Sequence, residues 1–263
     1  MRKISLNNPV ILVHGIAARD KNLFWGRIPA CLEALGIKVF FGNTDSWGPI
    51  ESNANFLKKT VDEVLKECHC ERVNIIAHSK GGLDARYLIS SLNYADKVAS
   101  LTTVSTPHRG SELVDYILKN QTVYKPIVRK IVKSVVHLYG DKSPDPYAIL
   151  SELGTKSMVK FNANNPNRKN VYYCSCHSLM KRPWDDLTVF FSFNYLKKEV
   201  GANDGVVTLR SATWGENFRL IEGKKKAGIS HAQIIDLKKK SISGVDISEE
   251  YVRMVSHLAR RGL

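Results

Sequence analysis

One serine has the surroundings that nucleophilic catalysis requires. Ser79 follows the apolar run 73–78, and small residues lie two positions away on either side, at Ala77 and Gly81. This pattern is typical of a sharp turn between a buried strand and a helix, which exposes the hydroxyl group and needs small neighbours because strand and helix approach closely. The backbone N–H of Lys80, at the start of the helix, is then predicted to donate to an oxyanion.

A second short motif supports this interpretation. Residues 10–13 form an apolar run that ends in His14-Gly15. A turn of this kind after an early strand presents a backbone N–H as a second oxyanion donor, and here that N–H belongs to Ile16. We expect His14 itself to be a buried structural histidine rather than a general base.

A serine hydroxyl is a poor nucleophile unless a histidine removes its proton, and that histidine needs an acidic partner. After a strand–serine–helix turn the usual chain order is serine, acid, histidine. The histidines after Ser79 are His108, His137, His177, His231 and His257. His231 lies in a loop after the last strand pattern and is the predicted base. His108, just past a strand end, is its strongest rival.

The predicted acid must precede His231. Asp204 lies in a Gly- and Asn-containing turn that enters the β-branched pair 206–207, a position suited to a functional carboxylate. A plain Asx turn would explain the same residue types. Asp185 and Asp186 are the alternative acids.

These residues require a frame, and the rest of the sequence predicts one. Apolar runs rich in β-branched and aromatic residues lie at 10–13, 39–41, 73–76, 101–104, 171–173 and 218–221. Helical patterns lie at 53–67 with Ser52 as N-cap, 80–92, 111–120, 147–163 and 247–260. Such alternation predicts one α/β domain over residues 1–263, with a mostly parallel sheet, helices on both faces, and the working residues beyond the carboxyl ends of the strands.

Residues 111–160 interrupt the alternation, because they contain no strand pattern. Within them, residues 124–139 place apolar side chains on one side of a helix and basic ones on the other. The segment is therefore predicted to be a helical insertion between two strands of the sheet.

Charge and composition limit the possible functions. The chain has 39 Lys and Arg against 25 Asp and Glu, a net charge of +14, and 43% hydrophobic residues, too many for a disordered chain. Residues 119–160 hold eight basic and three acidic residues, and residues 219–263 hold ten and five. Because most of the excess charge is in these two segments and no nucleic-acid-binding module is present, a nucleic-acid partner is not predicted.

The five cysteines predict neither disulfides nor zinc. Their number is odd, and one residue separates Cys174 from Cys176, closer than the usual zinc ligand pair. We expect reduced thiols, with those two on opposite faces of a strand. No apolar run reaches the ~20 residues of a membrane span, and no secretory h-region is evident, so a soluble, cytoplasmic protein is expected. A mature form that has lost a leader, or secretion by a non-classical route, is the alternative.

Together these motifs resemble the bacterial true lipases of the Pseudomonas and Burkholderia type, within the α/β-hydrolase superfamily. The matching segments are 13–15, 73–82, 105–111, 160–163, 171–173 and 203–207, in family order across residues 9–237. The resemblance implies an α/β-hydrolase fold, a Ser79–Asp204–His231 triad and an oxyanion hole formed by the backbone of Ile16 and Lys80. It also implies a helical lid at residues 111–160.

The sequence departs from that family at one metal ligand. The family's structural calcium is held partly by an aspartate two residues after the catalytic histidine, and here that residue is Gln233. Asp185 or Asp186 stands where the other acidic ligand is expected, but calcium takes six to eight oxygens and one carboxylate makes a weak site. We predict no bound calcium, no other metal, and no cofactor requirement.

The predicted function is hydrolysis of carboxylic esters, by a lipase acting on acylglycerols through an acyl-enzyme. The alternatives are an esterase or thioesterase for soluble acyl compounds, and a catalytically inactive scaffold that binds lipid or a partner. The basic amphipathic stretch at 124–139 predicts transient contact between the lid and an anionic lipid interface.

Overall fold

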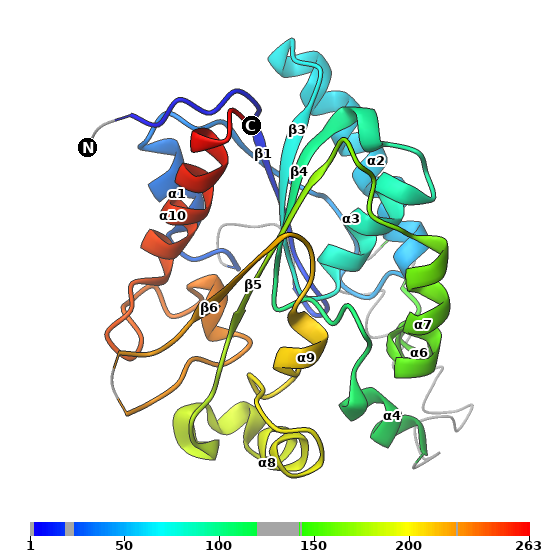
Figure 1. Cartoon of the computed structure of the whole chain (residues 1–263), viewed down its shortest axis with the longest axis vertical. Helices are drawn as coiled ribbons and strands as arrows, with labels where there is room; N and C mark the ends of the chain where they lie inside the picture. Colours follow the sequence, from blue (N-terminus) through cyan, green and yellow to red (C-terminus); the bar gives the residue numbers. More distant parts are fainter. Residues whose placement is uncertain (1–2, 19–23, 120–141, 143, 225) are drawn as a thin grey trace.

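The protein folds around one parallel sheet (Figure 1). The computed structural model describes residues 3–18, 24–119, 142, 144–224 and 226–263. The six strands are β1 (Val10–Val13), β2 (Val39–Phe41), β3 (Val73–His78), β4 (Val98–Val104), β5 (Tyr172–Ser178) and β6 (Asn217–Ile221). Their order across the sheet is β2-β1-β3-β4-β5-β6, and every neighbouring pair is parallel. Each predicted strand is present, and the predicted fold class is confirmed.

The three central strands are buried on both faces. Every residue of β1, β3 and β4 is buried. The register joins Ile11 to Ile75 and Ile75 to Leu101, so branched apolar side chains are adjacent across the middle of the sheet. This explains why these strands are nearly continuous apolar runs rather than alternating ones.

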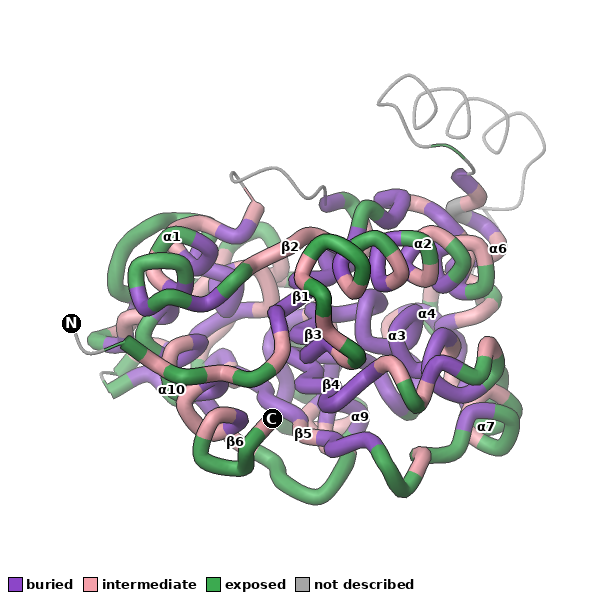
Figure 2. Tube along the Cα trace, turned by 90° about the horizontal axis from the view of Figure 1, so that it is seen from above, coloured by how far each residue is buried: buried purple, intermediate pink, exposed green. Residues whose placement is uncertain are grey.

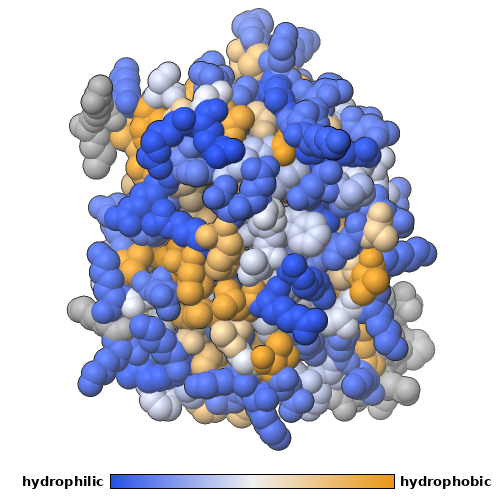
Figure 3. Space-filling view, in the orientation of Figure 1, coloured by the Kyte–Doolittle hydropathy of each residue, from blue (hydrophilic) through white to orange (hydrophobic). Residues whose placement is uncertain are grey.

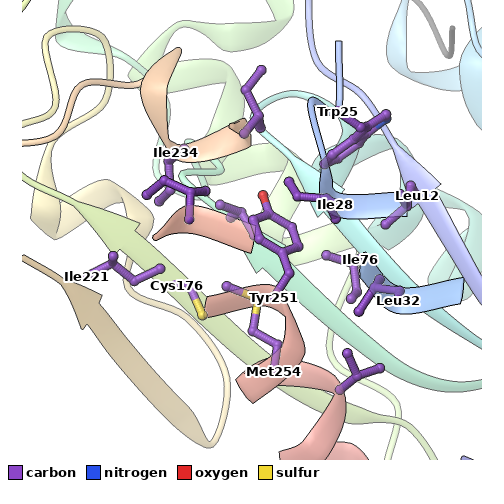
Figure 4. Packing of buried hydrophobic residues seen from close by; sticks show 14 of the residues in the cluster. Leu12, Trp25, Ile28, Leu32, Ile76, Cys176, Ile221, Ile234, Tyr251 and Met254 are labelled. Atoms are coloured by element: carbon purple, nitrogen blue, oxygen red, sulfur yellow. The ribbon is translucent and has the colours of Figure 1, made fainter. Parts of the chain in front are cut away.

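Helices cover both faces of the sheet (Figure 1). Helices α1 (Ile28–Glu33) and α10 (Ile247–Arg260) pack on one face, and α2 (Ile50–Cys68) and α3 (Gly81–Ser90) on the other. Figure 4 shows Tyr251 and Met254 of α10 and Ile28 and Leu32 of α1 pointing into one core with sheet residues such as Ile76. Buried positions concentrate on the strands and the inner sides of these helices (Figure 2). The core therefore fixes where the carboxyl ends of the strands lie.

Several predicted helix boundaries are wrong. Helix α2 begins at Ile50, with Pro49 at the N-cap position and no side-chain cap, so Ser52 lies inside the helix. The single helix predicted at 147–163 is two helices, α6 (Pro146–Leu153) and α7 (Thr155–Asn164), because the chain turns at Gly154. Helices α1, α8 (Phe190–Glu199) and α9 (Leu209–Ala212) were not predicted, since they are short or lack a regular apolar spacing.

The insertion at 111–160 is described in part. Its described helices are α4 (Glu112–Lys119), α6 and the first half of α7. Val114, Ile149 and Leu153 pack with Ile50 and Leu83 of the body of the protein. The amphipathic stretch at 124–139 lies outside the described residues. The described part of the insertion is therefore anchored to α2 and α3.

The helices and the surface also bear on the sequence-based predictions. None of the described helices is long and apolar enough to cross a membrane. Polar and charged residues cover most of the face in Figure 3, and apolar ones gather beside the lower end of α10.

All five cysteines are free thiols. The prediction that Cys174 and Cys176 face opposite ways is wrong. Both line the same pocket beside α10, because residues two apart on a strand share a face.

Candidate active site

Ser79 lies on the sharp turn between β3 and α3. Its backbone has a φ of 53°, in the left-handed region that non-glycine residues rarely occupy, at a cost of about 1–3 kcal/mol. Two hydrogen bonds maintain this conformation: the Ser79 N–H donates to the Val104 carbonyl at 2.8 Å, and the Thr106 hydroxyl donates to the Ser79 carbonyl at 2.7 Å. The neighbouring strand β4 thus holds the serine at the carboxyl edge of the sheet.

Two glycines let the turn pack tightly. A Cβ atom at Gly81 would clash with the His14 carbonyl oxygen, and one at Gly15 would clash with the Ser79 side chain. The small residue predicted at position 81 is therefore needed because the start of α3 packs directly on the end of β1. Gly15 brings the loop after β1 against the serine.

The structure brings Ser79, His231 and Asp204 together from three separate segments. His231 Nδ1 lies 2.8 Å from Asp204 Oδ2, and His231 Nε2 lies 3.0 Å from Ser79 Oγ. A carboxylate only accepts hydrogen bonds, so Nδ1 carries the proton and Nε2 is free to accept the serine hydroxyl. In addition, the His231 N–H donates to the Asp204 carbonyl at 2.9 Å. The arrangement is that of a nucleophile, a base and an orienting acid.

Asp204 is fully buried and yet held in its charged form. Burial opposes ionisation, but attraction to His231 and His177 and hydrogen bonds from His231 and the Val207 N–H outweigh it, so the pKa of Asp204 falls below its usual value. Its Oδ1 accepts the N–H groups of Val206 and Val207 at 3.0 and 2.8 Å. The turn on which the prediction of Asp204 rested thus also supplies the two N–H donors that orient its carboxylate.

Two further histidines flank this group, although neither was selected from the sequence. His78 Nε2 donates to the His231 carbonyl at 3.1 Å, and the two rings are 4.6 Å apart. His177 Nδ1 lies 3.6 Å from Asp204 Oδ2 and 3.0 Å from Ser105 Oγ. Burial lowers the pKa of His177 to about 4 and that of His78 well below its ordinary value. Both are therefore neutral at pH 7.

The two predicted oxyanion donors border the serine. Lys80 is the N-cap residue of α3, directly after Ser79, and Ile16 follows Gly15, which packs against the serine. Within the described residues, neither the Ile16 N–H nor the Lys80 N–H donates to a protein acceptor. N–H groups that no described residue accepts, lying beside a nucleophile, are suited to stabilise negative charge on a substrate oxygen.

The rival histidines have other surroundings. His14 is buried, with its ring nitrogens 2.7 Å from the Gly15 carbonyl and 3.0 Å from the Thr44 carbonyl, as expected of a structural histidine. His108 is buried and stacks on Trp214, and its Nε2 lies 2.9 Å from the Thr103 hydroxyl. Neither ring is hydrogen-bonded to Ser79.

The alternative acids bind backbone and hydroxyl groups instead of the imidazole. Asp185 Oδ2 accepts the N–H groups of Lys181, Arg182 and Gly228 at 2.8, 2.9 and 2.7 Å. Asp186 accepts from the hydroxyl groups of Thr188 and Ser230. Of the three aspartates considered, Asp204 is the one hydrogen-bonded to His231.

The residues near position 233 do not fit a calcium ion. Gln233 Oε1 accepts the Ser230 N–H at 3.0 Å, and three N–H groups converge on one oxygen of Asp185. Asp185 Oδ2 and Gln233 Oε1 are thus already engaged by N–H donors, whereas calcium requires six to eight convergent oxygens. Among the described residues, no cluster of three or more His, Cys, Asp or Glu is placed to hold a metal.

Relatives with curated names agree with the resemblance in the sequence. A triacylglycerol lipase 2 of Saccharomyces cerevisiae is 29% identical over 261 residues, covering 91% of this chain and 74% of that protein. A triacylglycerol lipase of Burkholderia plantarii is 34% identical over 178 residues, covering 60% of this chain and 48% of that protein. The chain thus spans about half the length of this bacterial relative. The predicted similarity to lipases of this bacterial type is confirmed.

Solved structures show the fold, and a family model shows the family. A Staphylococcus hyicus lipase has a TM-score of 0.73 at 16% identity, covering 98% of this chain and 97% of that one. The mature Bacillus licheniformis lipase BlEst2 has a TM-score of 0.71 at 20% identity, covering 97% and 94%. The model described as palmitoyl protein thioesterase matches residues 9–168. Because this match spans more than half of the chain, the chain belongs to the palmitoyl protein thioesterase family.

Proposed function

We propose that this protein hydrolyses carboxylic esters of lipids, with Ser79 as nucleophile, His231 as base and Asp204 as the acid that orients it. The observation that carries the proposal is the continuous hydrogen-bonded chain from Ser79 Oγ through the His231 ring to Asp204 Oδ2, at 3.0 and 2.8 Å. Relatives named triacylglycerol lipase support the lipid ester as substrate class.

In the proposed mechanism the Ser79 oxygen attacks the ester carbonyl carbon while His231 Nε2 takes the hydroxyl proton. The carbonyl oxygen becomes an oxyanion that accepts the N–H groups of Ile16 and Lys80. His231 then protonates the departing alcohol, leaving an acyl-serine. Water attacks this ester by the same sequence, with His231 again as base, and releases the fatty acid. The anionic Asp204 stabilises the imidazolium form of His231 in both halves.

Turnover of nitrophenyl esters over a series of acyl chain lengths tests the proposal. We expect hydrolysis by the wild type and a loss of roughly 10⁴-fold or more in kcat for Ser79→Ala, because the acyl-enzyme cannot form. A Ser91→Ala variant, whose hydroxyl bonds Asn165 Oδ1 at the far end of α3, is the matched control. If the wild type were inactive on every chain length, the proposal of ester hydrolysis would be wrong.

A second candidate is hydrolysis of acyl thioesters, which the same residues would perform by the same steps. The family match favours it, since the model's name describes a thioesterase. Comparing kcat/KM for a nitrophenyl ester and an acyl thioester of equal chain length separates the two. A higher value for the thioester would make that bond the preferred substrate.

Contact of the insertion with a lipid interface is part of the same proposal. Its basic amphipathic stretch at 124–139 lies outside the described residues, so the support is its sequence pattern. Raised salt is expected to weaken binding to anionic vesicles more than turnover of a soluble ester. Equal salt dependence of the two would contradict it.

A further inference from the structure

We propose that Asp185, Asp186 and Gln233 form a metal-free clamp that positions His231 for catalysis. These three residues, here called the histidine clamp, take no part in the proposed chemical steps. In the sequence the two aspartates are alternative acids, and Gln233 stands where the related lipases have a calcium ligand. The inference rests on the proposed function, because it assigns a positioning role to residues around the same site.

The clamp holds the loop just before His231 at two points. The Gly228 N–H donates to Asp185 Oδ2 at 2.7 Å, three residues before the histidine. The Ser230 hydroxyl donates to Asp186 Oδ2 at 2.5 Å, one residue before it. Residues from the turn after β5 thus hold a loop that follows β6, and the held residues are adjacent to the base.

Gln233 closes the clamp from the other side of the histidine. Its Oε1 accepts the Ser230 N–H at 3.0 Å, and its Nε2 donates to the Asp185 carbonyl at 3.1 Å. The amide therefore bridges the two segments with one acceptor and one donor, both buried with the side chain at 3% exposure. An aspartate has no donor for the Asp185 carbonyl, so glutamine is suited to this role in a way that a metal-ligating carboxylate is not.

The two carboxylates of the clamp are stabilised by hydrogen-bond donors of the protein. Burial raises the pKa of Asp185, but the N–H groups of Gly228, Arg182 and Lys181 outweigh this and lower it. Asp186 behaves alike, with the Ser230 and Thr188 hydroxyls as the opposing donors. These donors supply the stabilisation of the two carboxylates that the hydrogen bonds to the loop require.

Positioning matters because His231 has two short contacts to maintain at once. A loop that shifts by a fraction of an ångström lengthens either the bond to Asp204 or the contact with Ser79, and such misplacement lowers the rate steeply. The clamp fixes residues 228 and 230, while the His231 N–H and carbonyl are held by Asp204 and His78. The loop is thus held on both sides of the imidazole.

The main test is Gln233→Ala, with Asn55→Ala as control, since Asn55 is an exposed amide that bonds the Glu51 carbonyl within α2. We expect kcat on a soluble short-chain ester to fall about tenfold with KM nearly unchanged, because substrate binding does not involve the clamp. The NMR signal of the His231 Nδ1 proton is expected to move upfield in the variant, because its hydrogen bond to Asp204 Oδ2 lengthens. A lower melting temperature with unchanged kcat and an unchanged Nδ1 proton signal would overturn the positioning role.

Gln233→Glu sharpens the test through its protonation state. An ionised glutamate lacks the donor and faces the Asp185 carbonyl, whereas a protonated one restores it. The ratio of variant to wild-type kcat should therefore rise as the pH is lowered, while the same ratio for Gln233→Ala stays flat. A flat ratio for both variants would contradict the hydrogen-bond account.

Calcium provides the last arm. We expect the wild-type melting temperature and the NMR signal of the His231 Nδ1 proton to be unchanged by a chelator and by added CaCl₂, compared with MgCl₂ at equal ionic strength. A specific rise with calcium would show that a metal holds the loop instead. Both readouts need no substrate, so failure of the clamp is distinguishable from failure of the proposed hydrolase activity.

Discussion

The turn that carries Ser79 and the loops that carry Asp204 and His231 reach the same edge of the sheet by different means. Residues 73–82, the serine turn, are one continuous segment whose strand, turn and helix start are all encoded locally. Residues 203–207 and 228–233, the acid–histidine loops, are held by hydrogen bonds between distant segments. The shape of the serine turn is thus encoded in one continuous segment, which two hydrogen bonds from residues 104 and 106 brace. The acid and the base, in contrast, meet only through contacts between distant segments.

The largest expected effect comes from removing the charge of Asp204, which tests the acid–histidine loops. Asp204→Asn should lower kcat about 10⁴-fold while the protein stays folded, because the amide cannot hold His231 in the tautomer that accepts the serine proton. Steady-state kinetics with melting curves check this. Asp62→Asn is the control, since Asp62 accepts from Tyr94 and Lys97 away from the site. A near-normal kcat for Asp204→Asn would show that another residue is the orienting acid.

The next effect concerns the serine turn. Lys80 Nζ and Asp84 Oδ1 form a buried ion pair 2.6 Å apart, one helical turn into α3, with both side chains at most 2% exposed. Lys80→Met should destabilise the fold by about 3–5 kcal/mol, because it leaves Asp84 buried without its partner. Urea unfolding measures this.

A double variant shows whether the lost stability comes from the broken ion pair or from the new side chain at position 80. Lys80→Met with Asp84→Leu removes both charges and should recover most of the lost stability. The folded single variant should keep most of its activity, since Lys80 contributes to the proposed chemistry through its backbone N–H. A double variant no more stable than Lys80→Met would show that the ion pair is not the cause.

The smallest effect is a pH dependence that comes from the acid–histidine side. The folded pKa of His177 is lowered to about 4 by burial, against 6.5 when it is exposed. Between these values the unfolded chain binds a proton that the folded protein does not, so stability falls as pH drops from 6.5 to 4, by up to about 3 kcal/mol, and then levels off. Urea unfolding at pH 7, 6, 5 and 4.5 checks this. His177→Gln should be less pH-sensitive than the wild type, and parallel curves would contradict the assignment.

The sequence predicted the central frame because burial leaves a direct pattern. Strands such as β1 and β3 are apolar on both faces, and the Ser79 turn follows β3 without interruption. Short helices such as α1 and the break at Gly154 escaped prediction, because tertiary packing rather than periodicity decides them.

The chain's own residues thus determined the sheet, the serine turn and a short list of acids and bases, since these follow from local apolar spacing and small-residue requirements. The sequence predicted Asp204 ahead of Asp185 and Asp186, but only the tertiary structure shows its carboxylate hydrogen-bonded to His231, with His78 and His177 beside the group. It also showed Gln233 bridging two loops. The physical reason is that a hydrogen bond depends on ångström-scale distance between segments far apart in sequence, which the spacing of residues along a chain does not specify.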